Sequence, residues 1–303
     1  MSELLEKHGF HFQKKYGQNF LQDVKIPRRI AAECTEYAEP AGFVPDTCDT
    51  PKIPALILEI GPGAGILTGE LAKRFEKVVA VEIDRSLEGV LAESLAPYDN
   101  AEVVFGDIME TDLNELLTPR RIGQNGNILP VSVCANLPYY ITTPILMRLV
   151  ESFANFDYIT VMVQKEVASR LTALPGSAEY GSITASLGLY GVCKRLFAVP
   201  SGCFYPRPKV DSAIVRLKLH KPPLYTEKQI KRAGEVIRAG FSMRRKTLAN
   251  TLAPFTGGDK AKVAEVLRDS LGISETVRGE TLSPAQYVAL SEALATSEFT
   301  KSN

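Results

Sequence analysis

Residues 55–65 read ALILEIGPGAG, an apolar run that passes directly into a glycine turn. The first six residues, Ala55 to Ile60, suit a strand that is buried on both faces of a parallel sheet. The residues that follow, Ile66 to Arg74, carry apolar side chains at helical spacing. The segment therefore predicts a strand, a turn and a helix, and the glycines, Gly61 and Gly63 among them, let the backbone approach a ligand closely.

A second strand is predicted from Lys77 to Asp84, and it carries an acid near its end. Glu82 follows Gly61 by about 20 residues, the distance at which a carboxylate accepts from ribose hydroxyls in nucleotide-binding βαβ units. The turn departs from strict GxGxxG spacing. This departure favours a smaller adenosyl cofactor, such as a methyl donor, over a dinucleotide.

A third strand, Glu102 to Phe105, ends at Gly106-Asp107-Ile108. Asp107 is then placed to hydrogen-bond an adenine amino group, with Ile108 beside the ring. Either acid alone is equally well explained as a helix or loop cap. The succession of strand ends favours the cofactor interpretation for Glu82 and Asp107 together.

The fourth predicted strand, Val131 to Ala135, stops at Asn136-Leu137-Pro138-Tyr139, because a proline cannot continue a ladder. Ligands of open α/β sheets bind at the carboxyl ends of the strands, so these residues are expected in a cleft. The Asn136 carboxamide oxygen and a backbone carbonyl offer two acceptors, which suits an exocyclic amine. Tyr139 and Tyr140 add flat faces for stacking. The alternative is a strand end and turn with two half-buried tyrosines.

The remaining segments complete an α/β domain and add a helical one. Strands are expected at Tyr158–Val163 and at Lys209–Leu217, the latter closing the sheet, and the stiff connection Cys203–Pro208 is placed to fold over the cleft. After Leu219 the pattern predicts helices only. We expect a Rossmann-like α/β domain at residues 1–220, with an N-terminal basic arm at 1–30, and a small all-helical domain at 221–303.

Composition narrows the class of protein. With 45% hydrophobic and 23% charged residues the chain has the composition of a globular protein with a real core. It has no apolar run near the roughly 20 residues of a membrane helix, and its start lacks the pattern of a secretory signal, so we expect a cytoplasmic protein. Five cysteines without CxxC spacing predict free thiols, and three scattered histidines predict no metal site.

The formal net charge of zero is unevenly distributed. Basic residues gather between His11 and Arg29, including Lys14 and Lys15, and again between Lys221 and Asn250. The second segment is expected to contain helices at Glu227–Phe241, Arg244–Leu252, and beyond it at Asp259–Leu271 and Pro284–Leu294. Two interpretations stay open from charge alone: a footprint for a polyanion, or solvated helix faces.

With these pieces in place, the chain resembles the KsgA-type ribosomal RNA adenine dimethyltransferases over nearly its whole length. The motifs that carry the resemblance are Tyr16-Gly17-Gln18-Asn19-Phe20-Leu21, Glu59-Ile60-Gly61-Pro62-Gly63, Val81-Glu82-Ile83-Asp84, Gly106-Asp107, Asn136-Leu137-Pro138-Tyr139, Pro206-Arg207-Pro208-Lys209-Val210-Asp211-Ser212 and Arg244-Arg245-Lys246-Thr247-Leu248. The proline-rich loop from Glu39 to Pro54 is longer than the family usually shows.

The resemblance implies an S-adenosylmethionine-dependent methyltransferase domain at residues 1–220, a helical RNA-binding domain at 221–303 and an RNA substrate. The residues expected to bind the cofactor are Asn19, Leu21, Gly61, Gly63, Glu82, Ile83, Asp107, Ile108 and Asn136. The substrate implied is a pair of adjacent adenines in a hairpin near the 3′ end of 16S rRNA, each dimethylated in the immature small subunit. Asn136, Leu137, Pro138 and Tyr139 are expected to hold the target adenine, with Phe204 stacking from the other side.

Phosphates of the RNA are expected to meet basic residues outside the cleft, namely Lys14, Lys15, Arg207, Arg244, Arg245 and Lys246. We expect a monomer, because no extended apolar seam is evident. Two other functions are weighed: a large-subunit rRNA adenine methylase of the antibiotic-resistance type, and a non-catalytic ribosome-assembly or RNA-binding factor. The Asn-Leu-Pro-Tyr form and the long helical tail favour the small-subunit enzyme over the first, and intact Asn136, Glu82 and Asp107 argue against the second.

Overall fold

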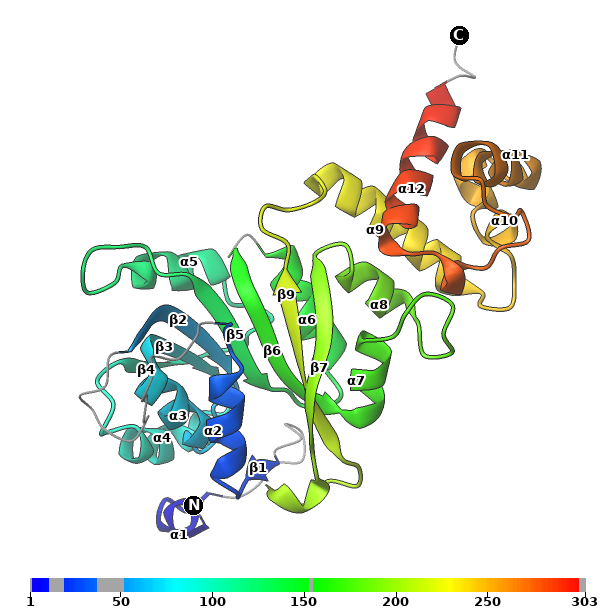
Figure 1. Ribbon diagram of the computed structural model, residues 1–303. Coiled ribbons are helices and arrows are strands. Elements are labelled where there is room, and N and C mark those ends of the chain that lie inside the picture. Colours follow the sequence, from blue (N-terminus) through cyan, green and yellow to red (C-terminus); the bar gives the residue numbers. More distant parts are fainter. Residues whose placement is uncertain (1, 11–18, 37–51, 153–154, 300–303) are drawn as a thin grey trace. The chain divides into compact units, whose positions relative to one another are not determined.

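The computed structural model describes residues 2–10, 19–36, 52–152 and 155–299. The chain divides into two compact units, shown in Figure 1. The first comprises Met1–Ala168 and Lys194–Leu219, and the second comprises Ser169–Cys193 and His220–Asn303. No helix within the described ranges is long and apolar enough to cross a membrane.

A seven-stranded sheet organises the first unit, in the order β4-β3-β2-β5-β6-β9-β7. Its strands are β2 (Ile53–Ile60), β3 (Phe75–Glu82), β4 (Ala101–Phe105), β5 (Val131–Asn136), β6 (Phe156–Gln164), β7 (Gly191–Val199) and β9 (Ser212–Leu219). Strands β2 to β6 pair in parallel, whereas β9 runs antiparallel to β6. The sheet therefore has its switch point between β2 and β5, where the chain leaves one half of the sheet for the other.

The edge strand β7 was not predicted from the sequence, which had the segment at 209–217 closing the sheet. The structure corrects this, because β9 lies between β6 and β7. The β7 strand carries exposed Lys194 and Arg195 in its middle, as an edge strand can, so it lacks the continuous apolar run of its buried neighbours.

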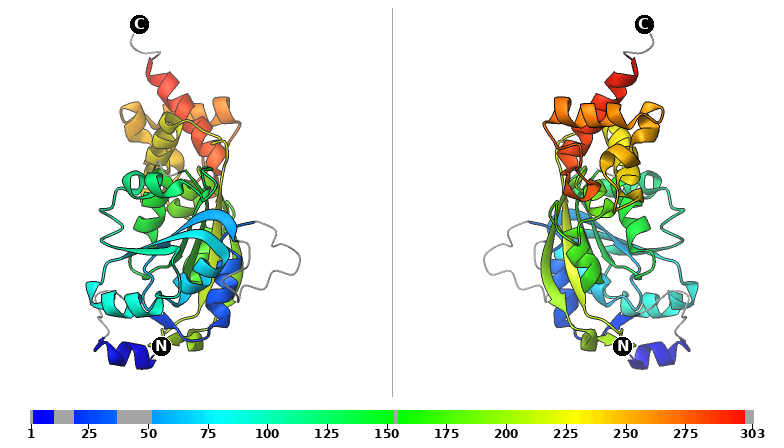
Figure 2. Two further views of the ribbon diagram at one scale, coloured as in Figure 1. Left: turned by 90° about the vertical axis from the view of Figure 1, so that its left-hand side faces the viewer. Right: turned by 90° about the vertical axis from the view of Figure 1, so that its right-hand side faces the viewer.

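Helices cover the sheet of the first unit (Figures 1 and 2). They are α1 (Ser2–Lys7), α2 (Lys25–Ala32), α3 (Ile66–Arg74), α4 (Glu88–Ser94), α5 (Leu113–Leu117), α6 (Thr142–Glu151) and α7 (Lys165–Leu171), whose end passes into the second unit. Right-handed crossovers put α3 and α6 on opposite faces, because the chain moves outward from β2 in two directions. Helix α2 packs beside α3. The core at this interface includes Ile30, Leu71 and Phe75.

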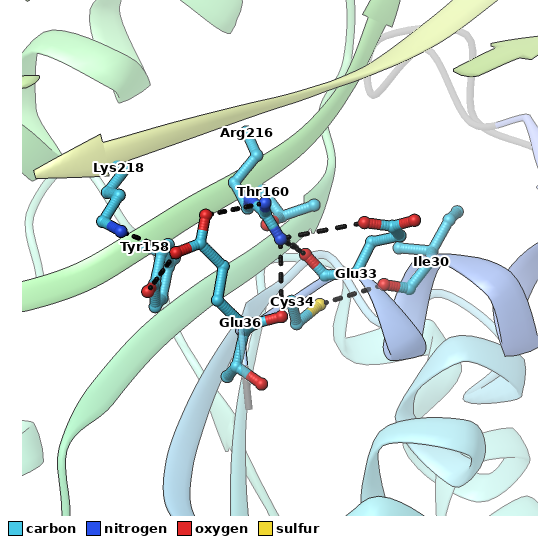
Figure 3. A network of polar contacts seen from close by, with 9 residues as sticks. Ile30, Glu33, Cys34, Glu36, Tyr158, Thr160, Arg216 and Lys218 are labelled. Atoms are coloured by element: carbon cyan, nitrogen blue, oxygen red, sulfur yellow. Dashed lines mark hydrogen bonds and ion pairs between the residues drawn. The ribbon is translucent and has the colours of Figure 1, made fainter. Parts of the chain in front are cut away.

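The residues that follow α2 are fastened to β6 and β9 by a polar network (Figure 3). Arg216 is 9% exposed and donates from Nη2 to Glu36 Oε1 at 3.0 Å and from Nη1 to the Glu33 carbonyl at 3.2 Å. Glu36 Oε2 also accepts from Lys218 at 2.6 Å and from the Tyr158 hydroxyl at 3.1 Å. Its bond with Lys218 is the first cause of a lowered Glu36 pKa. The network anchors the chain on the C-terminal side of α2.

The second unit is helical, with its own core. Its helices are α8 (Ser182–Leu187), α9 (Glu227–Ser242), α10 (Leu248–Thr251), α11 (Lys260–Glu265), which continues as a π-helical turn to Ser270, and α12 (Pro284–Phe299). The rings of Tyr180 and Tyr287 both pack against Phe241, and the Tyr180 hydroxyl donates to the Leu282 carbonyl at 2.9 Å. These contacts explain why Ser169–Cys193 joins this unit, a difference from the contiguous domain expected at 221–303.

Candidate active site

Three neighbouring parallel strands end level with one another at the switch point. Ile60 of β2 is in register with Val81 of β3 and with Ala135 of β5. The next residue on each strand is therefore Gly61, Glu82 or Asn136, and the three form one row across the sheet. Sequence spacing alone places each at a strand end, whereas the register brings them side by side.

Two backbone N–H groups of the glycine turn between β2 and α3 already have backbone partners, one on β3 and one within the turn. Gly61 donates to the Val81 carbonyl and Gly65 donates to the Pro62 carbonyl, both at 2.9 Å. Gly63 has a φ of 58°, and a Cβ built on it would lie 2.7 Å from Cε1 of Phe20. The glycine turn therefore lets a ligand approach the backbone closely. The backbone N–H groups that have no partner within the helix are those of the first turn of α3.

Glu82 is 4% exposed and already holds two backbone groups. Its Oε2 accepts from the Gly63 N–H at 3.1 Å and its Oε1 accepts from the Asp84 N–H at 2.8 Å. Burial raises the pKa of this carboxyl, while the two backbone bonds act in the opposite direction. The carboxyl group is thus fixed in orientation at the rim of the turn and keeps further lone pairs for a ligand.

Glu59 belongs to the site although the sequence argument assigned it no role. It is 1% exposed and lines the same cleft, and its Oε2 has no hydrogen-bond partner among the described residues. Burial, followed by the charge of Glu82, raises the pKa of the Glu59 carboxyl to about 8. The sequence signal that could have found Glu59 is its position, one residue before the end of an otherwise apolar strand. Burying a carboxyl group without a partner costs free energy, so an acid in such a strand indicates a functional role.

Asn136 is oriented by the segment before α2. Its Nδ2 donates to the Asn19 carbonyl at 3.2 Å. The Asn136 Oδ1 atom and the neighbouring Leu137 carbonyl have no hydrogen-bond partner among the residues that the structure describes. Two acceptors therefore remain available at the end of β5, although Leu137 itself is 1% exposed.

Tyr139 and Tyr140 follow in a tight turn that Ile141 closes by donating to the Pro138 carbonyl at 3.2 Å. The Tyr139 hydroxyl lies 2.9 Å from Ser212 Oγ at the start of β9, which holds this ring at the cleft. Tyr140, in contrast, is 66% exposed. The structure thus separates two tyrosines that the sequence treated as one pair.

One cleft collects most of the residues predicted to bind cofactor or target. These are Asn19, Leu21, Gly61, Gly63, Glu82, Ile83, Asn136, Leu137, Pro138 and Tyr139. The cleft is also lined by Phe20 and Glu59. Phe20 and Leu21 form β1, which pairs with β8 (Phe204–Tyr205), so the segment before α2 is held in place by a two-residue ladder.

Asp107 and Ile108 lie one strand further along and are not among the residues lining this cleft. Asp107 Oδ1 accepts from the Met109 N–H at 2.8 Å, which makes Asp107 the start of a tight turn. Arg148 of α6 holds that turn from outside, donating to the Ile108 carbonyl at 2.9 Å and to the Thr111 carbonyl at 2.6 Å. No sequence pattern singles out Arg148.

Phe204 does not line the cleft in this structure. Its side chain is 3% exposed and belongs to the core cluster that contains Leu21 and Ile214. The next residue, Tyr205, is 49% exposed, because successive side chains of a strand point to opposite faces. The expected stacking of Phe204 on the target is therefore not supported by this geometry.

The predicted phosphate-binding residues lie in different parts of the chain. Lys14 and Lys15 lie outside the described residues. Arg207 is exposed and donates to Ser201 Oγ at 3.2 Å. Arg244, Arg245 and Lys246 are exposed too, but the predicted helix from Arg244 is wrong: α10 begins only at Leu248. The basic residues occupy the turn after α9, where the Lys246 N–H donates to the Met243 carbonyl.

The sheet order and the cleft at its switch point define an S-adenosylmethionine-dependent methyltransferase. The family model for ribosomal RNA adenine dimethylase matches residues 9–296. The chain belongs to this family and is an rRNA adenine dimethyltransferase whose methyl donor is S-adenosylmethionine.

Individual proteins give the same result. The chain is 41% identical over 299 residues to Ribosomal RNA small subunit methyltransferase A of Geobacillus kaustophilus strain HTA426, covering 97% of this chain and 94% of the relative. Among solved structures it is similar to the 23S rRNA methyltransferase ErmE, with a TM-score of 0.64, 26% identity and coverage of 91% and 99%. A dimethyladenosine transferase from Plasmodium falciparum shares the fold, with a TM-score of 0.68, 24% identity and coverage of 93% and 98%.

Proposed function

We propose that this protein dimethylates the exocyclic amines of two adjacent adenines in the 3′-terminal hairpin of 16S rRNA during maturation of the small subunit. The observation that carries the proposal is the pair of acceptors at the end of β5, Asn136 Oδ1 and the Leu137 carbonyl, beside the anchored ring of Tyr139. The small-subunit methyltransferase from Geobacillus supports the choice of RNA, since it matches nearly the whole chain.

The cleft fits an adenosyl methyl donor. Glu59 Oε2 is a buried carboxyl oxygen without a partner in the part of the chain that the structure describes, and a bound polar group would satisfy such an atom. We assign the ribose hydroxyls to Glu82 and the close backbone approach to Gly61 and Gly63. Asn19, Leu21 and Ile83 complete the cofactor surface, and Asp107 with Ile108 extends it toward the adenine. When bound, the donor supplies a methyl group on a positively charged sulfur.

The chain's own residues act mainly by positioning. Asn136 Oδ1 and the Leu137 carbonyl accept the two N–H bonds of the target amine, which turns its nitrogen lone pair away from the ring and toward the methyl group. The bound donor would supply its methyl group to this nitrogen and leave as the neutral thioether, and the proton that the amine then loses would pass to solvent. Pro138 shapes the turn that brings both acceptors to the cleft.

The target adenine has to leave its stack before it can enter the cleft. Tyr139 provides a ring face for it, a contact that contributes about 1–3 kcal/mol per base in other systems. Its hydroxyl bond to Ser212 holds the ring in place. Phe204 reaches the opposite face only if its side chain leaves the core, so we assign the stacking role to Tyr139 first.

Exposed cations supply the electrostatic part of RNA binding. We propose that Arg207, Arg245 and Lys246 contact phosphates, together with Arg244, which also lies 3.5 Å from Glu280. Lys14 and Lys15 are proposed for the same role from sequence alone. Affinity for the subunit should fall as the salt concentration rises, because each phosphate contact releases counterions.

We propose further that the protein is a cytoplasmic monomer.

The test is methyl transfer from labelled S-adenosylmethionine to small subunits that lack the modification, with large-subunit RNA as comparator and the products identified after digestion. Dimethyladenosine in the small-subunit RNA alone is expected. Label in large-subunit RNA would favour the second candidate, suggested by the likeness to ErmE. Cofactor binding without transfer would favour a non-catalytic assembly factor. Asn136→Ala should abolish transfer while the protein stays folded, and full transfer by this variant would contradict the assignment.

A further inference from the structure

Two exposed aromatic residues lie next to residues that line the cleft, and the mechanism above uses neither. Among the described residues, Tyr140 and Tyr205 are the exposed aromatic side chains, at 66% and 49%. Tyr140 directly follows Tyr139, which lines the cleft. Tyr205 is in register with Phe20, which also lines it. Each exposed tyrosine is therefore adjacent to a residue of the cleft lining, one along the chain and one across a strand pair.

The surrounding contacts hold these segments in place without using the Tyr140 ring. The turn from Pro138 to Ile141 is closed by a backbone bond, and the Tyr139 hydroxyl is tied to Ser212. Tyr140 has no hydrogen-bond or ring partner in the part of the chain that the structure describes. The backbone that carries the Tyr140 ring is held in place, while the ring itself is exposed to solvent and has no partner there. Such a ring contributes little to the stability of the fold and is suited to stack on a base.

The charge around the opening suits a nucleic acid. Arg207 and Lys209 are exposed in the connection between β8 and β9, two and four residues after Tyr205. Single-stranded RNA is bound by this combination of aromatic faces with nearby cations that follow the backbone. A base beside the unstacked target is itself exposed on one face, so a ring at the cleft mouth can cover it.

We propose that Tyr140 stacks on the nucleotide next to the target adenine, with Tyr205 on the opposite side of the opening. The enzyme would then favour substrates in which the base next to the target is a purine. The proposal rests on the proposed function and adds a specificity determinant to it. A substrate with two adjacent adenines presents each target with a purine beside it. Methyl groups on the amine leave the ring face intact, so the same platform serves before and after the first adenine is modified.

The experiment compares wild type, Tyr140→Ala and Tyr140→Phe on unmodified small subunits. A second substrate carries uridine in place of the adenine beside the target. Tyr140→Ala should lower kcat/KM for the normal subunit by about 5-fold to 100-fold, since stacking contributes about 1–3 kcal/mol per base and about 1.4 kcal/mol is tenfold. The KM for S-adenosylmethionine should not change, and Tyr140→Phe should recover most of the loss because it keeps the ring.

The uridine substrate separates stacking from a merely structural role. On it, wild type should fall toward the level of Tyr140→Ala, and the substitution should add little further loss. Ile128→Ala is the matched control, because Ile128 is 69% exposed and lies outside the cleft lining. Equal losses on both substrates, or a Tyr140→Ala variant that matches wild type, would overturn the role of Tyr140. Absence of transfer by wild type would instead overturn the proposed function.

Discussion

Glu82 on β3 accepts a hydrogen bond from the backbone N–H of Gly63, with 3.1 Å between Oε2 and the nitrogen. This bond joins the acid at the end of β3 to the glycine turn that follows the neighbouring strand β2. The ring of Phe20 packs over the same glycine. The proposed cofactor surface is therefore a single assembly of three chain segments, and a change in one segment should affect the other two.

Gly63→Ala tests this assembly. A Cβ there would meet Phe20 at 2.7 Å, and its φ of 58° already strains an alanine. We expect a loss of stability of about 1–3 kcal/mol from the backbone strain alone and a further loss of cofactor affinity from the displaced ring. Gly126→Ala is the control, because its φ is 75° but no atom lies within 4 Å of the added Cβ. Calorimetric binding of S-adenosylhomocysteine and thermal unfolding measure both effects. Equal affinity in the two variants would contradict the argument.

Glu59 should make stability depend on pH in an unusual direction. Its pKa is raised from 4.5 to about 8 by burial, so the folded protein keeps a proton that the unfolded chain releases. The contribution of the protonated Glu59 carboxyl to the free energy of unfolding is fully present below pH 4.5. It is lost as pH rises toward 8, at up to about 1.4 kcal/mol per pH unit. Glu59→Gln keeps the shape and removes the titration. Denaturant unfolding from pH 5 to pH 8 should show wild type losing stability relative to this variant, and parallel curves would disprove the assignment.

Arg148 should act on cofactor binding from outside the cleft. Its two bonds to the carbonyls of Ile108 and Thr111 hold the turn that begins at Asp107. Arg148→Met removes both, and a bond to a charged donor contributes about 1.5–3 kcal/mol, so the KM for S-adenosylmethionine should rise about tenfold or more. The kcat at saturation should change little. Arg120→Met is the control, since Arg120 pairs with Glu102 elsewhere. A fall in kcat with unchanged KM would indicate a different role.

Arg216 should stabilise the first unit through the network in Figure 3. Arg216→Met leaves the carbonyls of Glu33 and Thr35 and the Glu36 carboxylate without this donor. We expect a loss of about 2 kcal/mol in the free energy of unfolding, below the cost for a fully buried pair because Glu36 is partly exposed. Lys218→Met, which removes only an exposed partner, should change little. Similar losses in the two variants, measured by urea unfolding, would contradict this ranking.

Local pattern was sufficient for the parallel half of the sheet and for its glycine turn. Buried parallel strands such as β2 and β5 are continuous apolar runs, and their ends are marked by residues that cannot continue them, Gly61 and Pro138. The same logic missed β7, whose charged residues interrupt the run. It also extended a helix back to Arg244, because periodicity does not reveal that Thr247 is extended at the start of α10.

The sequence by itself determined which chemical groups stand at the strand ends, because composition and spacing are local properties. Glycines, Glu82 and Asn136 could be identified in this way. Tertiary structure decided which of them meet, because strand register and long-range bonds are set by packing between distant segments. It aligned Gly61, Glu82 and Asn136, added Glu59 to the cleft, turned Asn136 through the Asn19 carbonyl, buried Phe204 and left Tyr140 in solvent.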